Sequence, residues 1–114
     1  MATGPGWRQH LARPAVDVPR VELSRRAVEN LEWLSTTHSL PTDTRERVRR
    51  VLQPLATFPN LGRELEGRWA EHRVILGPWR WMLLVYRIDD PNDRVVVVTV
   101  QDARSSATAT SRHR

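Results

Sequence analysis

Two apolar runs joined by a polar turn constrain the fold of this chain more than any other feature. They lie between Arg80 and Asp102, and the turn between them reads Asp89-Asp90-Pro91-Asn92-Asp93. Strand-forming runs on either side of an Asp, Pro and Asn cluster indicate a β-hairpin. No other stretch is as dense in apolar residues, so we expect this hairpin to form the core of a sheet on which the other elements pack.

The second strand of the hairpin is apolar on both faces. In a regular strand one face would carry Val96, Val98 and Val100, and the other face Val95, Val97 and Thr99. Strands that are buried on both faces have this pattern. We therefore predict that this strand is interior to the sheet and that helices cover one of its faces.

The residues before the hairpin predict a strand, two helices and two more strands. Residues 18–23 alternate weakly and lead to Ser24, which is expected to cap a helix that runs to about His38. Thr42 is expected to cap a second helix, which Pro54 would kink or end. Its buried stripe would consist of Val48, Val51, Leu52 and Leu55. A weak strand over residues 64–69 and a strand over residues 71–76 then lead into the hairpin.

This order of elements predicts an α+β fold. An N-terminal strand would be followed by a two-helix hairpin and by a three- to four-stranded antiparallel meander packed against the helices. A chain of 114 residues has room for one such domain. We place the domain at residues 18–104, with a flexible extension at 1–17 and a flexible tail at 105–114.

The charge of the chain favours an anionic partner. The formal net charge is +5, and all 18 basic residues are Arg. RNA, DNA, acidic proteins and membrane surfaces all satisfy that preference. Because Lys is absent, a phosphate would be bound by guanidinium groups, and no Lys is available as a nucleophile or base.

Several classes of site have no support in the sequence. There is no Cys, so disulfides and thiolate metal sites are excluded, and a cytoplasmic location is expected. The N-terminus lacks a signal-peptide core, and no apolar run is long enough to cross a bilayer. A phosphate-binding Gly-rich loop, a pair of His at metal spacing and a serine nucleophile elbow are also missing. We therefore expect no cofactor, no metal and no membrane partner.

Five short motifs follow one another along the chain. They are Val21-Glu22-Leu23-Ser24; Phe58-Pro59-x-x-Gly62-Arg63-Glu64-Leu65; His72-Arg73-Val74 with Gly77-Pro78-Trp79-Arg80; Val85-Tyr86-Arg87-Ile88-Asp89; and Val97-Val98-Thr99-Val100-Gln101-Asp102-Ala103-Arg104. In order and spacing they resemble the RelE/ParE family of bacterial toxins from type II toxin-antitoxin systems. The resemblance covers roughly residues 19–106.

The resemblance implies a toxin that a separate antitoxin wraps and neutralises. Two activities occur on this fold: RelE-like members cut mRNA in the ribosomal A site, and ParE-like members inhibit DNA gyrase without being nucleases. Fold alone does not decide between them. We predict the RelE-like activity, a metal-independent mRNA endoribonuclease. A gyrase inhibitor or a degenerate, non-toxic member of the family is the alternative.

The resemblance also implies candidate catalytic residues. Arg73 matches the basic residue that begins the middle strand of the family, Arg80 the Arg before its Val-Tyr pair, and Arg104 the basic residue after its last strand. These three arginines are the predicted phosphate-binding cations of RNA cleavage. The match at Arg80 departs from the family, because six positions separate it from Tyr86 where about three are usual.

Acid–base candidates near these arginines are few: Glu71, His72 and Asp102. Tyr86 is in phase with apolar neighbours and is expected in the core.

Trp79, Trp81 and Arg87 are the predicted binding residues. Trp81 and Arg87 would share one face of the sheet with Leu83 and Val85, where they could hold a nucleotide by stacking and charge. Alternatively, Trp79 and Trp81 could be an apolar seat for the antitoxin.

Overall fold

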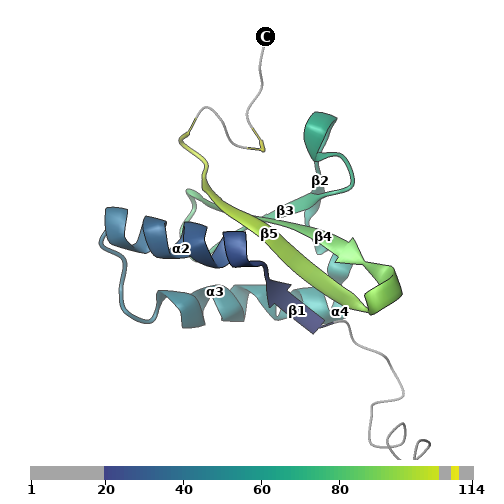
Figure 1. Ribbon diagram of the computed structural model, residues 1–114, viewed down its shortest axis with the longest axis horizontal. Coiled ribbons are helices and arrows are strands. Elements are labelled where there is room, and N and C mark those ends of the chain that lie inside the picture. The colour runs from purple at the N-terminus through teal and green to yellow at the C-terminus, as the bar shows by residue number, and fades with distance from the viewer. Residues whose placement is uncertain (1–19, 106–108, 111–114) are drawn as a thin grey trace, which may run out of the picture.

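The computed structural model describes residues 20–105 and 109–110 (Figure 1). Its helices and strands are, in chain order, β1 (Arg20–Leu23), α2 (Arg25–Thr37), α3 (Thr44–Leu52), α4 (Pro54–Thr57), β2 (Arg63–Glu64), β3 (Arg73–Leu76), β4 (Met82–Asp89) and β5 (Arg94–Asp102). The predicted extension at residues 1–17 and most of the predicted tail lie outside the described residues. In the tail, Ala109 donates its N–H to the side chain of Gln101 at 2.7 Å.

The five strands form one sheet in the order β1-β5-β4-β3-β2. Interior placement of the last strand is confirmed, because β5 lies between β1 and β4. The predicted antiparallel meander is confirmed by β2, β3, β4 and β5, and the N-terminal strand β1 pairs with β5 in parallel at one edge. Parallel pairing needs a long crossover connection, and here the chain between the two strands contains both long helices and three strands.

The predicted hairpin is confirmed by β4 and β5, which pair from Met82 opposite Asp102 to Asp89 opposite Arg94. The turn is closed by the carboxylate of Asp89, which accepts hydrogen bonds from Asn92 Nδ2 and Arg94 Nε, each at 2.9 Å. These two hydrogen bonds hold the pKa of Asp89 below its ordinary value, and the bond from Asn92 has the larger effect. The turn residues that signalled the hairpin in the sequence therefore also fix it.

A β-bulge in β5 changes the predicted alternation of its side chains. Val85 pairs with Thr99, whereas its neighbour Tyr86 pairs with Val97, so Val98 is the extra residue. As a result Val100 packs with Val95 and Val97 in the cluster beneath the helices, and Val98 packs on the opposite face. The expectation that Val96, Val98 and Val100 share one face is therefore wrong.

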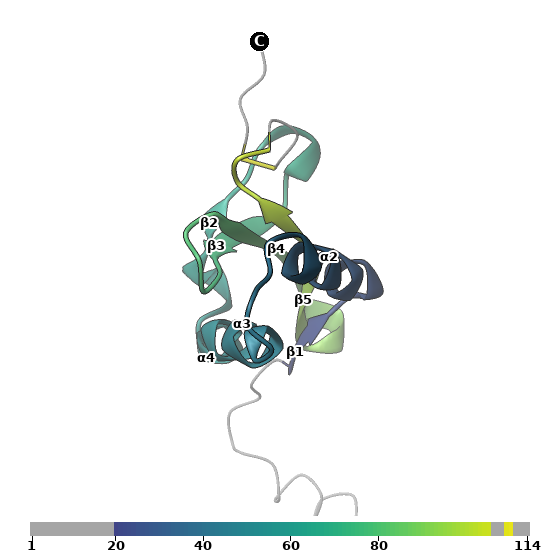
Figure 2. The same cartoon turned by 90° about the vertical axis from the view of Figure 1, so that its left-hand side faces the viewer.

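Helix α2 begins as predicted. Ser24 Oγ accepts the N–H of Ala27 at 3.0 Å and donates to the carbonyl of Val98 at 3.1 Å, which also ties the helix to the bulge. The buried face of α2 consists of Ala27, Leu31 and Leu34. Figures 1 and 2 show α2 lying over β5 on the same side of the sheet as α3.

Helix α3 begins at a different residue from the one predicted. Its N-cap is Asp43 rather than Thr42, and Asp43 pairs through its carboxylate with Arg47 Nε at 2.9 Å instead of capping a backbone N–H. Pro54 ends the helix as expected, and it then opens the short helix α4, where the missing N–H is not needed.

The strands before the hairpin are shorter than predicted. Strand β2 covers residues 63 and 64, so it shares only residue 64 with the predicted weak strand over 64–69, and residues 67–69 form a 3₁₀ turn. Strand β3 begins at Arg73 instead of Glu71, because Glu71 has a φ of 72°. The predicted weak strand is interrupted at Gly67, which has a φ of 65°. Positive φ values interrupt an extended strand.

Two apolar clusters lie on opposite faces of the sheet. The larger one, beneath the helices, contains Tyr86, whose predicted core position is confirmed by a relative exposure of 0%. Leu65, Val74, Leu83 and Val85 form the smaller one. No helix in the described part of the chain is long and apolar enough to span a bilayer.

Candidate functional site

The three predicted catalytic arginines do not meet in one place. Arg73 lies opposite Tyr86, whereas Arg104 follows Asp102, which pairs with Met82. Four residues of strand separate these two positions, which is about 13 Å. Arg80 is exposed in the turn just before β4, at the Arg104 end. The structure therefore places Arg80 and Arg104 at the start of β4, and Arg73 at the far end of the segment of β4 that pairs with β3.

Arg73 holds a loop of the protein itself. Its Nη1 donates to the carbonyls of Asn60 and Gly62, at 3.2 Å and 2.8 Å. Its Nη2 pairs with the carboxylate of Glu64 at 3.0 Å. The guanidinium of Arg73 is thus occupied by contacts within the chain.

Tyr86 completes this closed arrangement. Its hydroxyl donates to the carbonyl of Pro59 at 2.6 Å and accepts the N–H of Gly62 at 2.8 Å. Burial raises the pKa of Tyr86 above its ordinary value of 10.0, and the bond from Gly62 opposes that rise. We call Tyr86, Pro59, Gly62, Arg73 and Glu64 the Tyr86 site. Its phenol is a structural hydrogen-bonding group that is closed to a substrate.

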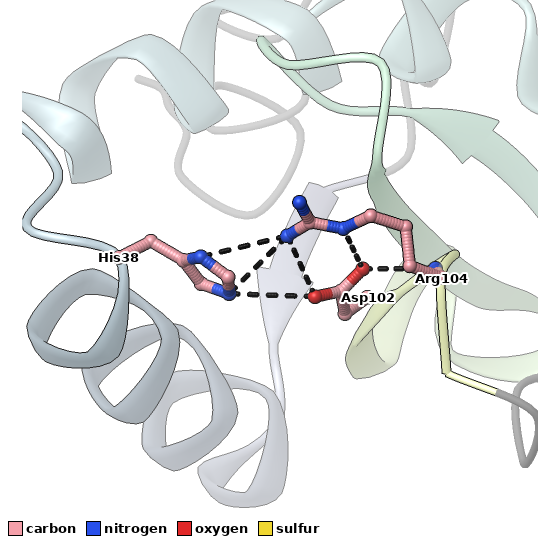
Figure 3. A network of polar contacts seen from close by, with 3 residues as sticks. All are labelled: His38, Asp102 and Arg104. Carbon is pink, nitrogen blue, oxygen red and sulfur yellow. Dashed lines mark hydrogen bonds and ion pairs between the residues drawn. The ribbon is translucent and has the colours of Figure 1, made fainter.

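A second group of residues lies at the start of β4, and we call Trp81, His38, Asp102 and Arg104 the Trp81 cluster. Arg104 holds the carboxylate of Asp102 with both arms of its guanidinium, Nε to Oδ1 and Nη2 to Oδ2, each at 2.9 Å (Figure 3). The backbone N–H of Arg104 also donates to Oδ1 at 2.9 Å. Chiefly through the bonds from the Arg104 side chain, the pKa of Asp102 is lowered to about 2.

His38 joins the Trp81 cluster from the C-terminal end of α2 (Figure 3). Its Nε2 lies 3.3 Å from Asp102 Oδ2, and its ring centroid lies 4.5 Å from that of Trp81. Arg104 Cζ also lies over Trp81, at 4.9 Å from the ring centroid. Sequence analysis did not single out His38 as a site residue. His38 and Arg104 are 66 positions apart, and only the packing of α2 on β5 brings them together.

Trp79 extends the Trp81 cluster toward α3. The Trp79 and Trp81 ring centroids are 6.4 Å apart with nearly parallel planes, and Arg47 Cζ lies 6.0 Å from the Trp79 ring. Arg47 was not predicted as a site residue either. The result is a row in which two stacked aromatic side chains, Trp79 and Trp81, lie between the cationic side chains of Arg47 and Arg104.

Arg87 is separate from that row. It is exposed on β4 opposite Val96, six positions beyond Trp81. The predicted shared face is wrong, because Trp81 packs against the cluster beneath the helices while Leu83 and Val85 belong to the opposite face. Trp81 precedes the regular strand, so strand alternation does not apply to it.

An apolar pocket of about 590 Å³ opens between β1 and the helices. Val21, Leu23, Val28, Val48, Leu52 and Ala56 supply its apolar lining. Arg45 and Arg49 also line it, as do Gln53 and Glu22, whose carboxylate pairs with Arg94 at 3.0 Å. The pocket therefore combines an apolar surface with a net positive charge. No group of three or more His, Asp or Glu residues that could hold a metal occurs within residues 20–105 and 109–110.

Comparison with known protein families gives one match. The model of the family described as the ParE toxin of the type II toxin-antitoxin system parDE matches residues 21–106. No curated protein sequence matches the chain.

Three solved structures with a similar fold come from toxin-antitoxin systems. A chain of the chromosomal ParDE system from P. aeruginosa superposes with a TM-score of 0.60 at 9% identity, over 78% of this chain and 100% of that chain. A mutant of the E. coli toxin RelE in the free state gives 0.57 at 21% identity, over 78% and 87%. The RelBE2 toxin-antitoxin complex from Mycobacterium tuberculosis gives 0.51 at 23% identity, over 75% and 98%. At sequence identities this low, the similarity shows that the fold is shared.

Proposed function

This chain belongs to the ParE toxin family of type II toxin-antitoxin systems, and from that premise we propose that it arrests growth by binding DNA gyrase, without cutting RNA. The coarser statement, a toxin of the RelE/ParE superfamily with a cognate antitoxin as partner, follows from the family. The choice of gyrase rests on one observation: the guanidinium groups of Arg73 and Arg104 are already occupied by the protein itself.

Metal-free RNA cleavage needs cations that hold the phosphate as negative charge develops on it. Arg104 has both arms on Asp102, and Arg73 is bound to two backbone carbonyls and to Glu64. Of the three candidates, Arg80 alone has no hydrogen-bond or ion-pair partner among the described residues. One exposed arginine is a weaker phosphate site than a converging set.

Cleavage also needs a proton acceptor and a proton donor with pKa values near the working pH. Asp102 has a pKa of about 2, so it is a weak base and is not protonated at neutral pH. Tyr86 is buried with both hydroxyl bonds made. These groups favour a toxin that acts by binding.

The antitoxin is expected to occupy the apolar pocket beside β1. Arg45 and Arg49 line it together with apolar side chains, so an amphipathic segment with Asp or Glu beside its apolar residues is complementary to it. Arg45→Glu combined with Arg49→Glu should weaken the complex with the antitoxin. Arg68→Glu on the exposed 3₁₀ turn is the control that should leave the complex intact.

Growth assays test the proposal at the coarse level. Expression of the chain without its antitoxin should arrest growth, and co-expression of a neighbouring antitoxin gene should restore it. Normal growth in the presence of well-expressed, folded protein would contradict toxicity and would favour a degenerate family member.

Two assays then separate the activities. Purified protein should inhibit supercoiling by DNA gyrase, and primer extension on translated mRNA should show no new cuts in the ribosomal A site. The opposite pair of results would establish RelE-like mRNA cleavage.

That second candidate is favoured by the imidazole of His38 beside the guanidinium of Arg104. If it is right, His38→Ala should abolish the cuts while the protein remains folded.

A further inference from the structure

The carboxylate of Asp102 is held by more donors than an ordinary surface ion pair provides. It receives the two arms of the Arg104 guanidinium and the Arg104 backbone N–H, all at 2.9 Å. His38 Nε2 adds a fourth contact at 3.3 Å (Figure 3). The side chain of Asp102 is 21% exposed, so solvent reaches this group of contacts.

These donors form the kind of set with which proteins bind phosphate. A planar guanidinium matches two oxygens of a phosphate as well as two oxygens of a carboxylate. A backbone N–H and an imidazole are further common phosphate ligands. In this protein all of these donors converge on the two carboxylate oxygens of Asp102, a residue of the chain itself.

The surroundings of the Trp81 cluster suit a nucleotide. Trp81 packs against both His38 and Arg104, and the half-buried Trp79 continues the stack. A pocket of about 510 Å³ opens beside the cluster, and its lining includes His38, Asp102 and the 66% exposed Trp33. Aromatic rings beside a cation are the usual platform for bases of single-stranded nucleic acid.

We propose that the Trp81 cluster is a binding site for a phosphate of single-stranded RNA, and that Asp102 keeps it closed by occupying the place of that phosphate. Residue 102 then determines specificity: with a carboxylate there, a chain of net charge +5 does not bind RNA through this cluster. The inference rests on the proposed function, since RelE-like cleavage at His38 and Arg104 would require the same cluster to be open to RNA.

The carboxylate that closes the cluster keeps its negative charge throughout the physiological pH range. Because the pKa of Asp102 is about 2, the carboxylate stays charged at neutral pH. A phosphate would have to displace a side chain that is two positions from its arginine in the chain, and the displaced charge would then repel it. Replacing the carboxylate is therefore the direct way to open the site.

The test is Asp102→Asn, which keeps the shape of the side chain and removes its charge. Binding of a short fluorescein-labelled single-stranded RNA is followed by fluorescence anisotropy at low and at moderate salt. Asp102→Asn should bind this RNA about tenfold or more tightly than the wild type, the gain that one charge-assisted phosphate contact gives. Its affinity should also fall more steeply with salt.

Asp43→Asn is the matched control. Asp43 pairs with Arg47 at 2.9 Å, and Arg47 lies over Trp79, so this variant makes the same charge change beside the same row of aromatic side chains. It has no converging backbone N–H or imidazole. Asp43→Asn should therefore change RNA affinity less than threefold or so, the size expected of a single exposed charge.

A second variant shows whether the gain acts through Arg104. Asp102→Asn combined with Arg104→Gln should return RNA binding to the level of the wild type. Asp102→Ser serves in place of Asp102→Asn if the latter fails to fold, as judged by circular dichroism.

Two results would overturn the proposal. One is equal tightening by Asp102→Asn and Asp43→Asn, which would mean that only net charge matters. The other is a folded residue-102 variant that binds RNA no better than the wild type. Gyrase inhibition is measured separately on the same proteins, so loss of one activity is distinguishable from loss of the other.

Discussion

The two ends of the segment of β4 that pairs with β3 carry the same three kinds of side chain and use them differently. At one end Tyr86, Arg73 and Glu64 meet in the Tyr86 site, where the aromatic side chain is fully buried. At the other end Trp81, Arg104 and Asp102 meet in the Trp81 cluster, where Asp102 and Arg104 are partly exposed.

The difference lies in what the arginine contacts. Arg73 binds backbone carbonyls 11 and 13 positions away, so it ties the loop before β2 to the sheet. Arg104 binds the carboxylate of a residue two positions away, a contact that fixes little beyond the local backbone. The same chemistry is therefore structural at one end and is available for ligand binding at the other. Four substitutions, ordered from the largest expected loss of stability to the smallest, test this contrast.

Gly62→Ala should be the most destabilising. A Cβ at residue 62 would lie 2.7 Å from the Tyr86 hydroxyl and 2.8 Å from the carbonyl of Val74, and the backbone oxygen has no room to move. We expect a loss of about 3 kcal/mol in the free energy of unfolding, measured by urea denaturation.

Gly77→Ala is the control for that substitution. Its new Cβ would meet the Met82 side chain, with the sulfur at 2.8 Å, and a methionine can adjust. An equal loss of unfolding free energy in both variants would mean that the Tyr86 site is packed no more tightly than the surroundings of Gly77.

Tyr86→Phe should cost about 2 kcal/mol, because it leaves the Gly62 N–H and the Pro59 carbonyl without their partner in a buried place. It should also change the response to alkali. The pKa of Tyr86 is raised in the folded state, so its contribution to stability is present below 10.0, the ordinary pKa, and is lost as the pH rises beyond it. Urea denaturation from pH 8 upward should show a steeper decline for the wild type than for Tyr86→Phe.

Arg73→Gln should cost about 1 kcal/mol, because glutamine cannot reach both carbonyls and the Glu64 carboxylate at once. The same variant should leave gyrase inhibition unchanged at temperatures where it is folded. A loss of inhibition without a loss of stability would return Arg73 to the functional site and would break the contrast between the two ends.

Sequence analysis found the elements that depend on local signals. The Asp-Pro-Asn turn at residues 89–93 and the cap at Ser24 are readable because each acts on neighbouring residues. The family resemblance supplied Arg73 and Arg104 as candidates. It could not assign their roles, since those depend on which atoms lie within about 3 Å in the folded chain.

Two features of the structure had no local signal in the sequence. His38 meets Asp102 only because α2 packs on β5. The bulge at Val98 shifts the pairing of β5 with β4 by one residue, and nothing in a run of four valines indicates where such a bulge occurs. Trp81 was assigned to the wrong face because the regular alternation of β4 begins one residue later, at Met82.

Asp102→Asn should have the smallest effect on stability, under about 1 kcal/mol, since exposed ion pairs contribute little. Because the folded-state pKa of Asp102 is lowered, its contribution is present above the ordinary value of 3.8 and is lost as the pH falls toward about 2. The wild type and Asp102→Asn should thus differ by a constant amount from pH 7 to pH 5 and converge below pH 3 in urea denaturation. A loss as large as that of Tyr86→Phe would show that the Trp81 cluster is as structural as the Tyr86 site, and that the carboxylate of Asp102 is retained for the fold and not for exclusion of RNA.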